Sequence, residues 1–231
     1  MTPESKATMG TTAAAQQVTR TAPDGENQLL AWFQARQKVI GITVGVLALL
    51  ALVIWYTIEA GHRKQAQAME ALDRARAAME SGNYPEASTG FQRVTQTFAG
   101  TDAAYEAALA LNQVRLLSGQ GKLASDELKK FAASNPPAPY NSAAHATLAM
   151  ALEDLGKPAE AAAEYQKAAD LATEDFRKVD ALLNVARVLR TTGKEKEAIA
   201  VWQDIIKKYP KERSAVAEAR VRLAEVTHGL E

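Results

Sequence analysis

The chain has 231 residues, and its 27 Lys and Arg residues balance its 27 Asp and Glu residues, so the formal net charge is zero. This balance argues against a nucleic-acid-binding protein, which needs a basic surface. Cysteine is absent, which excludes disulfides, thiolate metal sites, cysteine nucleophiles and a lipidated N-terminal cysteine. Helix-forming residues dominate and β-branched alternation is scarce, so we expect an all-α fold.

The first segment, residues 1–25, is rich in Thr, Ala, Gln and Pro and has almost no large apolar residue. Such a segment buries too little apolar surface to offset the entropy cost of ordering. We predict a disordered tail.

The most apolar segment is VIGITVGVLALLALVIWYTI, residues 39–58, which carries no charge over 20 positions. As a helix it is about 30 Å long, the thickness of the hydrocarbon core of a bilayer. Trp55 and Tyr56 close it, as aromatic residues do at a membrane interface. The run starts far from the N-terminus and no small-residue cleavage site follows it, which argues against a signal peptide. We predict one transmembrane helix.

The segment between tail and span, residues 26–38 (ENQLLAWFQARQK), has two interpretations. It is either a short amphipathic helix on the membrane surface, with Leu29, Leu30 and Phe33 facing the lipid, or an extension of the transmembrane helix. Basic residues near the span number three on its N-terminal side and four on its C-terminal side. Charge alone therefore does not decide the orientation.

Residues 59–231 contain an internal repeat marked by Gly82, Gly119, Gly156 and Gly193, each 37 residues after the one before. Five positions after each glycine stands an alanine, and nine positions after it stands Phe91, Leu128, Tyr165 or Trp202. Glycine permits a left-handed turn, the small residues let two helices approach closely, and the large residue fills the space to the next unit. Pro85 and Pro158 fall where the second helix of a unit begins. The pattern predicts stacked helix–turn–helix units that bury their apolar faces on one another.

The turns and second helices GNYPEASTGFQRV, GKPAEAAAEYQKA and GKEKEAIAVWQDIIKKYP resemble tetratricopeptide (TPR) repeats over roughly residues 65–228. The usual period of that family is about 34 residues, so the helices or loops here are longer. The resemblance implies a TPR-like α-solenoid of about four repeats, closed by a capping helix at residues 214–227.

The layout of tail, LLAWFQARQK lead-in, single span and repeat array also resembles the membrane-anchored ancillary subunit of the bacterial Sec translocon. That resemblance implies a single-pass protein of the bacterial inner membrane, with a cytoplasmic N-terminus and a periplasmic C-terminal domain. Its expected partners are translocon subunits, chaperones or client polypeptides, besides the lipid around residues 39–58. The alternative is an envelope structural or assembly scaffold that self-associates or bridges envelope complexes.

No catalytic, cofactor or metal site is expected. His62, His145 and His228 are far apart in sequence, and the sequence has neither a phosphate-binding loop nor a nucleophile motif. We therefore expect a protein that is not an enzyme and takes no cofactor.

The predicted functional surface is the concave groove that the first helices of TPR units form. Positions equivalent in each repeat give the candidate groove residues Met69, Leu72, Arg76, Met79, Leu109, Gln113, Leu116, Met150, Glu153, Leu183, Arg187, Arg190 and Arg220. Methionine suits adaptable binding of apolar segments, and arginine suits carboxylates of a partner. In the other interpretation the apolar residues pack in the core and the arginines pair with nearby glutamates.

Overall fold

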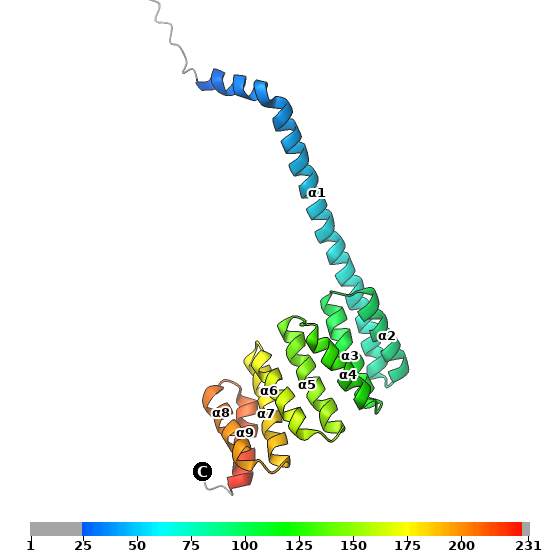
Figure 1. The fold of residues 1–231 in the computed structure, drawn as a ribbon, viewed down its shortest axis with the longest axis vertical. Coiled ribbons are helices and arrows are strands. Elements are labelled where there is room, and N and C mark those ends of the chain that lie inside the picture. The colour runs from blue at the N-terminus through cyan, green and yellow to red at the C-terminus, as the bar shows by residue number, and fades with distance from the viewer. Residues whose placement is uncertain (1–24, 228–231) are drawn as a thin grey trace, which may run out of the picture. The chain divides into compact units, whose positions relative to one another are not determined.

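The computed structural model describes residues 25–227, which form helices joined by short loops (Figure 1). The helices are α1 (Gly25–Glu80), α2 (Tyr84–Thr97), α3 (Asp102–Leu117), α4 (Gly121–Ala133), α5 (Ala138–Asp154), α6 (Pro158–Leu171), α7 (Asp175–Thr191), α8 (Glu195–Lys208) and α9 (Arg213–Thr227). The chain divides into two compact units, and the boundary lies within α1, between Ile58 and Glu59. The all-α expectation holds for the described residues.

The first unit, as far as it is described, is residues 25–58 of α1. The apolar residues from Val39 to Ile58 lie in it, and the most apolar window of the helix has a mean hydropathy of 2.5 and none of its residues buried. By length and composition this is the one described helix suited to cross a membrane. The predicted tail, apart from Gly25, lies outside the described residues, as do the side chains of Leu29, Leu30 and Phe33.

The second unit, Glu59–Glu231, is a stack of antiparallel helical hairpins. The C-terminal part of α1 pairs with α2, and the hairpins α3–α4, α5–α6 and α7–α8 follow, with α9 as the last helix (Figure 1). We call the first helix of each hairpin an A helix and the second a B helix. The predicted capping helix at residues 214–227 is α9.

The four repeat glycines make the same turn. Gly82, Gly119, Gly156 and Gly193 have φ between 69° and 78°. At each turn the glycine N–H bonds the carbonyl three residues back, and the next N–H bonds the carbonyl five residues back, at 2.8–3.1 Å. These two bonds define a Schellman motif, which satisfies the last carbonyls of the A helix. Pro85 and Pro158 lie in the first turns of α2 and α6, where a missing N–H costs no hydrogen bond.

The loops inside and between the repeats are three or four residues long. The A helices α3, α5 and α7 have 16 or 17 residues, and the B helices have 13 or 14. The short loops therefore leave most of each 37-residue period to the two helices of the hairpin.

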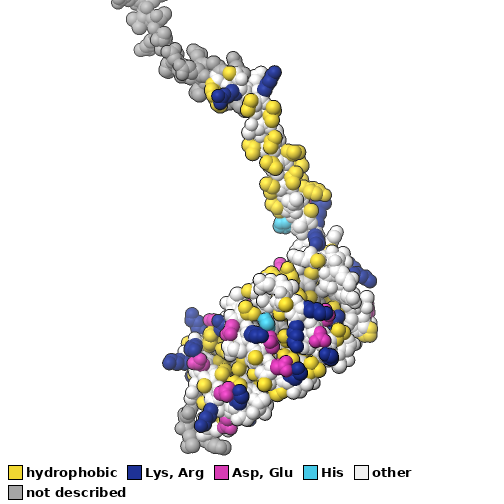
Figure 2. Space-filling view, viewed as in Figure 1, with side chains coloured by type: hydrophobic (Ala, Val, Ile, Leu, Met, Phe, Trp, Pro, Cys, Tyr) yellow, Lys and Arg dark blue, Asp and Glu magenta, His cyan; other side chains and the backbone are white. Residues whose placement is uncertain are grey.

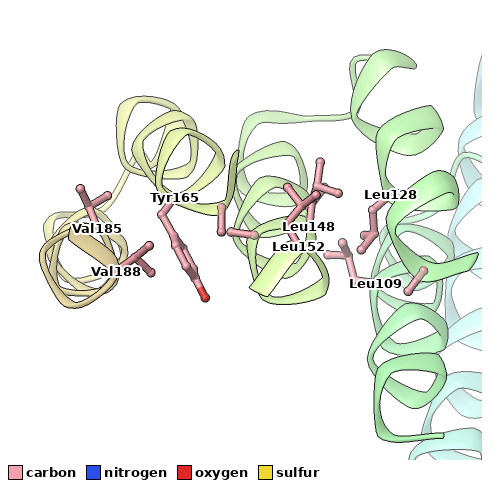
Figure 3. Packing of buried hydrophobic residues seen from close by; sticks show 11 residues of the cluster. Leu109, Leu128, Leu148, Leu152, Tyr165, Val185 and Val188 are labelled. Atoms are coloured by element: carbon pink, nitrogen blue, oxygen red, sulfur yellow. The ribbon is translucent and has the colours of Figure 1, made fainter. Parts of the chain in front are cut away.

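The core follows the repeat pattern. The alanine five positions after each glycine is completely buried, and Phe91, Leu128, Tyr165 and Trp202 are at most 3% exposed. In the central cluster Tyr165 lies between α6 and the α7 residues Val185 and Val188, while Leu148 and Leu152 of α5 face Leu128 (Figure 3). Each large B-helix residue thus fills the space that its hairpin leaves toward the next one.

Candidate functional site

The A helices and α9 line three neighbouring hollows. The first holds about 350 Å³ and is lined by Arg76, Met79, Leu109 and Gln113, among others. The second holds about 580 Å³ between α5, α7 and α9, and the third about 400 Å³ between α7 and α9. Gln113 borders both the first and the second hollow, and Leu183 both the second and the third. The three hollows therefore adjoin one another along the repeat unit, and we call them together the groove.

Most of the predicted groove residues line this groove. They are Arg76, Met79, Leu109, Gln113, Met150, Leu183, Arg187 and Arg190. Arg76, Gln113, Met150 and Arg187 stand at the same position of successive repeats, six residues before the turn glycine. This position faces the groove in every hairpin.

The other predicted residues lie elsewhere. Leu72 is completely buried in the core that α1 forms with α2 and α3, so it is a packing residue and its assignment to the groove is wrong. Met69 and Leu116 are partly buried and pack against the core clusters. Glu153 contacts Arg187 and Tyr165 instead of lining a hollow, and Arg220 is an exposed residue of α9 that lines none of these hollows. The offset of a residue from the turn glycine predicts the helix on which it lies, but it does not predict how deeply its side chain is buried.

The arginines of the groove are paired across neighbouring A helices. Arg76 of α1 pairs with Glu106 of α3. Arg187 of α7 donates from Nη1 to Oε2 of Glu153 at 2.8 Å and from Nη2 to Oε1 at 2.7 Å. The next pair along the stack, Arg190 with Glu225 of α9, has a distance of 2.7 Å. These guanidinium groups are therefore not free to bind a partner's carboxylate.

The pair at Glu153 includes a buried tyrosine. The Tyr165 hydroxyl donates to Oε1 of Glu153 at 2.9 Å, and Tyr165 is 3% exposed. The hydrogen bonds from Arg187 hold the pKa of Glu153 below its ordinary value of 4.5, against the opposing effect of burial. Burial raises the pKa of Tyr165, and the bond to Glu153 raises it further. Glu153 is thus an ionised acceptor that joins α5, α6 and α7.

The histidine of α5, His145, has a structural role. His145 Nδ1 of α5 lies 2.5 Å from Oε2 of Glu164 in α6, and Lys167 Nζ lies 2.7 Å from Oε1 of the same carboxylate. Burial raises the pKa of Glu164, but the hydrogen bonds from Lys167 and His145 outweigh it and lower the pKa overall. Within residues 25–227, no three or more His, Asp or Glu side chains gather in a way that would hold a metal ion. His228 lies outside the described residues.

Sequence reasoning missed most residues that line the second hollow, among them the aromatic Phe176 and the acidic Asp180, Glu212 and Glu218. Phe176, Asp180 and Leu183 follow one another at helical spacing on α7, so the predicted Leu183 carried a signal for the other two. Glu212 and Glu218 reach the groove only because α9 packs against α7. The 37-residue period of the sequence does not predict that packing.

A helical-hairpin solenoid with a groove over its first helices is the architecture of TPR-like scaffolds. The sequence profile of the tetratricopeptide repeat-like domain family matches residues 31–217, so the chain belongs to this family. The match begins before the apolar segment 39–58 and includes it. TPR-like repeats generally mediate protein–protein interactions, and such scaffolds are typically non-catalytic.

Two similar solved structures are of TPR-like repeats of a putative kinesin light chain from Podosopora anserina. The first is 17% identical, with a TM-score of 0.58, over 71% of this chain and 87% of the other. The second, a variant described as Q17M, is 14% identical, with a TM-score of 0.52, over 71% of this chain and 98% of the other. At these identities the likeness shows the fold alone. No curated protein matches the chain.

Proposed function

We propose that the protein is a membrane-anchored, non-catalytic scaffold that binds other proteins in its groove. The observation that carries the proposal is the second hollow of the groove, in which the large apolar side chains of Met150 and Phe176 lie 49% and 55% exposed. Water-exposed apolar surface on a concave face is typical of a binding site for another protein.

The anchor part of the proposal rests on residues 39–58. All but one of their side chains are described, and each of those is exposed, with Ile42 at 69% and Tyr56 at 66%. Figure 2 shows hydrophobic side chains along the visible face of this segment. A continuous apolar surface of this length is unfavourable in water and favourable in a bilayer.

The finer proposal is that the protein is an ancillary subunit of the bacterial Sec translocon, and it rests on the resemblance in layout. In this proposal the N-terminus is cytoplasmic, and the repeat unit lies in the periplasm, where it holds chaperones or emerging polypeptides near the channel. The family match across the apolar segment supports a layout in which span and repeats belong together.

Two measurements test the proposal in cells. A reporter fused after Glu231 that is active only outside the cytoplasm is expected to be active, and an inactive reporter would contradict the translocon proposal. A photo-crosslinker at Met150 is expected to capture translocon subunits, chaperones or clients. Capture of lipid or detergent alone contradicts the scaffold proposal. Concentration-dependent self-association in light scattering, with crosslinks only between copies, would favour the self-associating envelope scaffold instead.

A further inference from the structure

The middle of the groove has an apolar floor of small residues. Ala143, Ala146 and Thr147 of α5 line it together with Met150 and Leu183. These α5 residues recur at helical spacing and present one face of the helix. Because the side chains of Ala143, Ala146 and Thr147 are short, a partner segment can approach the backbone of α5 closely. It can then place an apolar side chain against Met150 and Phe176.

The rim of this floor is acidic. We call Asp180, Glu212 and Glu218 the acidic rim; all three line the hollow of about 580 Å³. Among the described residues, neither the Asp180 nor the Glu212 side chain forms an ion pair. Glu218 Oε1 lies 3.7 Å from Nε of Arg222, which also contacts Glu225. Two of the three carboxylates therefore have no cationic partner, and the third shares one.

The cation that lines the same hollow is already occupied. Arg177 Nε lies 3.3 Å from Glu174, and its guanidinium carbon lies 5.4 Å from the centre of the Phe176 ring. The neighbouring Arg187 and Arg190 are paired with Glu153 and Glu225. Within the lining of this hollow, three carboxylates therefore stand against one guanidinium that already has a partner, whereas the paired Arg187, Arg190 and Arg222 line the third hollow.

We propose that this part of the groove binds a protein segment in which a large apolar side chain is flanked by Lys or Arg. The apolar side chain packs on Met150 and Phe176, and the flanking cations pair with Asp180 and Glu212. The carboxylates of the acidic rim attract a basic segment and repel an acidic one. The rim therefore determines which apolar segments bind to the floor. The inference rests on the proposed scaffold function and gives the chemical class of its partner.

The test uses the full-length protein in detergent micelles and three fluorescently labelled peptides. Each peptide has the same central Leu-Phe-Leu; its flanking residues are Lys and Arg in one, Gln in the second and Glu in the third. Fluorescence anisotropy is expected to give a Kd for the basic peptide about tenfold below that of the Gln peptide, and the weakest binding for the acidic one. Raising the ionic strength from about 0.05 M to about 0.3 M is expected to reduce the preference, since Asp180 is exposed and Glu212 is only partly buried.

Two variants locate the effect. Asp180→Asn together with Glu212→Gln is expected to raise the Kd of the basic peptide to that of the Gln peptide and to leave the Gln peptide unchanged. Phe176→Ala is expected to weaken both. The matched control is Glu195→Gln, an exposed carboxylate of α8 outside the groove, which is expected to change nothing. Unchanged circular dichroism of each variant shows that the repeat unit is folded.

The possible failures are distinguishable. If basic and Gln peptides bind equally, or the acidic peptide binds most tightly, the charge assignment is overturned while the scaffold proposal stands. If none of the peptides binds although Met150 crosslinks to proteins in cells, the inference again fails alone. If Met150 also captures no protein, both the inference and the proposed function fail.

Discussion

Replacement of Glu153 by alanine tests the junction between α5, α6 and α7. In the structure this carboxylate accepts two hydrogen bonds from Arg187, at 2.7 and 2.8 Å, and one from Tyr165, at 2.9 Å. Without it the Tyr165 hydroxyl, which is almost fully buried, loses its acceptor at a cost of about 1–3 kcal/mol. The ion pair adds at most about 1 kcal/mol, because the Arg187 side chain is 49% exposed and returns to water. We expect Glu153→Ala to lower the free energy of unfolding by about 2–3 kcal/mol.

A double-mutant cycle separates the two contributions. In a Tyr165→Phe background no buried hydroxyl is stranded, so Glu153→Ala is expected to cost only the ion-pair part, about 1 kcal/mol or less. The assay is urea unfolding of the full-length protein in detergent micelles, followed by helical circular dichroism. Glu225→Ala is the matched control, since its pair with Arg190 is exposed on both sides and its loss is expected to be undetectable. Equal costs for Glu153→Ala in the two backgrounds would refute the role assigned to Tyr165.

The remaining predictions concern pH, packing and the turns. The pKa of Glu153 is lowered in the folded state, so the ionised carboxylate contributes to the free energy of unfolding. This contribution is fully present above the ordinary pKa of 4.5 and is lost as the pH falls through the lowered pKa. Glu153→Gln is expected to remove this part of the loss of stability measured between neutral and acidic pH. Leu128→Ala empties a completely buried position and is expected to cost about 2–5 kcal/mol in urea unfolding, while Leu117→Ala, at a position 58% exposed, is expected to cost almost nothing. Gly156→Ala is expected to cost about 1–2 kcal/mol through its positive φ alone, since an added Cβ meets no atom within 4 Å, and Gly156→Asn is expected to cost less; equal losses for both variants would contradict this account.

Glycine in the interior of α2 has a different reason from glycine in the turns. A Cβ on Gly90 would lie 2.8 Å from Cβ of Ala75, so α1 and α2 approach each other too closely here for any side chain. The sequence shows Ala75 as a small residue of the repeat pattern but does not indicate that Gly90 contacts it. The two residues are 15 positions apart, and a glycine stands at this position in only the first hairpin. The turn glycines, by contrast, could be assigned from sequence, since their requirement for a positive φ is local and recurs at a fixed interval.

The same distinction explains which parts of the groove could be predicted. The Arg, Gln, Met and Arg at the position six residues before each turn face the groove because helical geometry is local. Their chemical availability depends on contacts between residues about one repeat apart, such as Arg187 with Glu153 and Arg190 with Glu225. A list of residues by position contains the charges but not their pairing. The sequence therefore leaves open whether the groove arginines are free or paired with glutamates, and the structure shows that Arg76, Arg187 and Arg190 are paired.

Packing and binding therefore place different demands on equivalent positions. The alanine five residues after each turn is buried in all four hairpins, where any larger side chain would separate the two helices. The groove position six residues before each turn meets no such restriction and differs from one hairpin to the next. A repeated fold can thus present an unrepeated surface, because the stack fixes the spacing of the A helices while the side chains between them vary. The second hollow is acidic and apolar, whereas the first hollow, near α1, has an ion pair, Arg76 with Glu106. A partner that recognises this difference between the two hollows would bind in one direction along the groove. The reverse direction would place the cations of the partner beside Arg76 rather than beside the acidic rim.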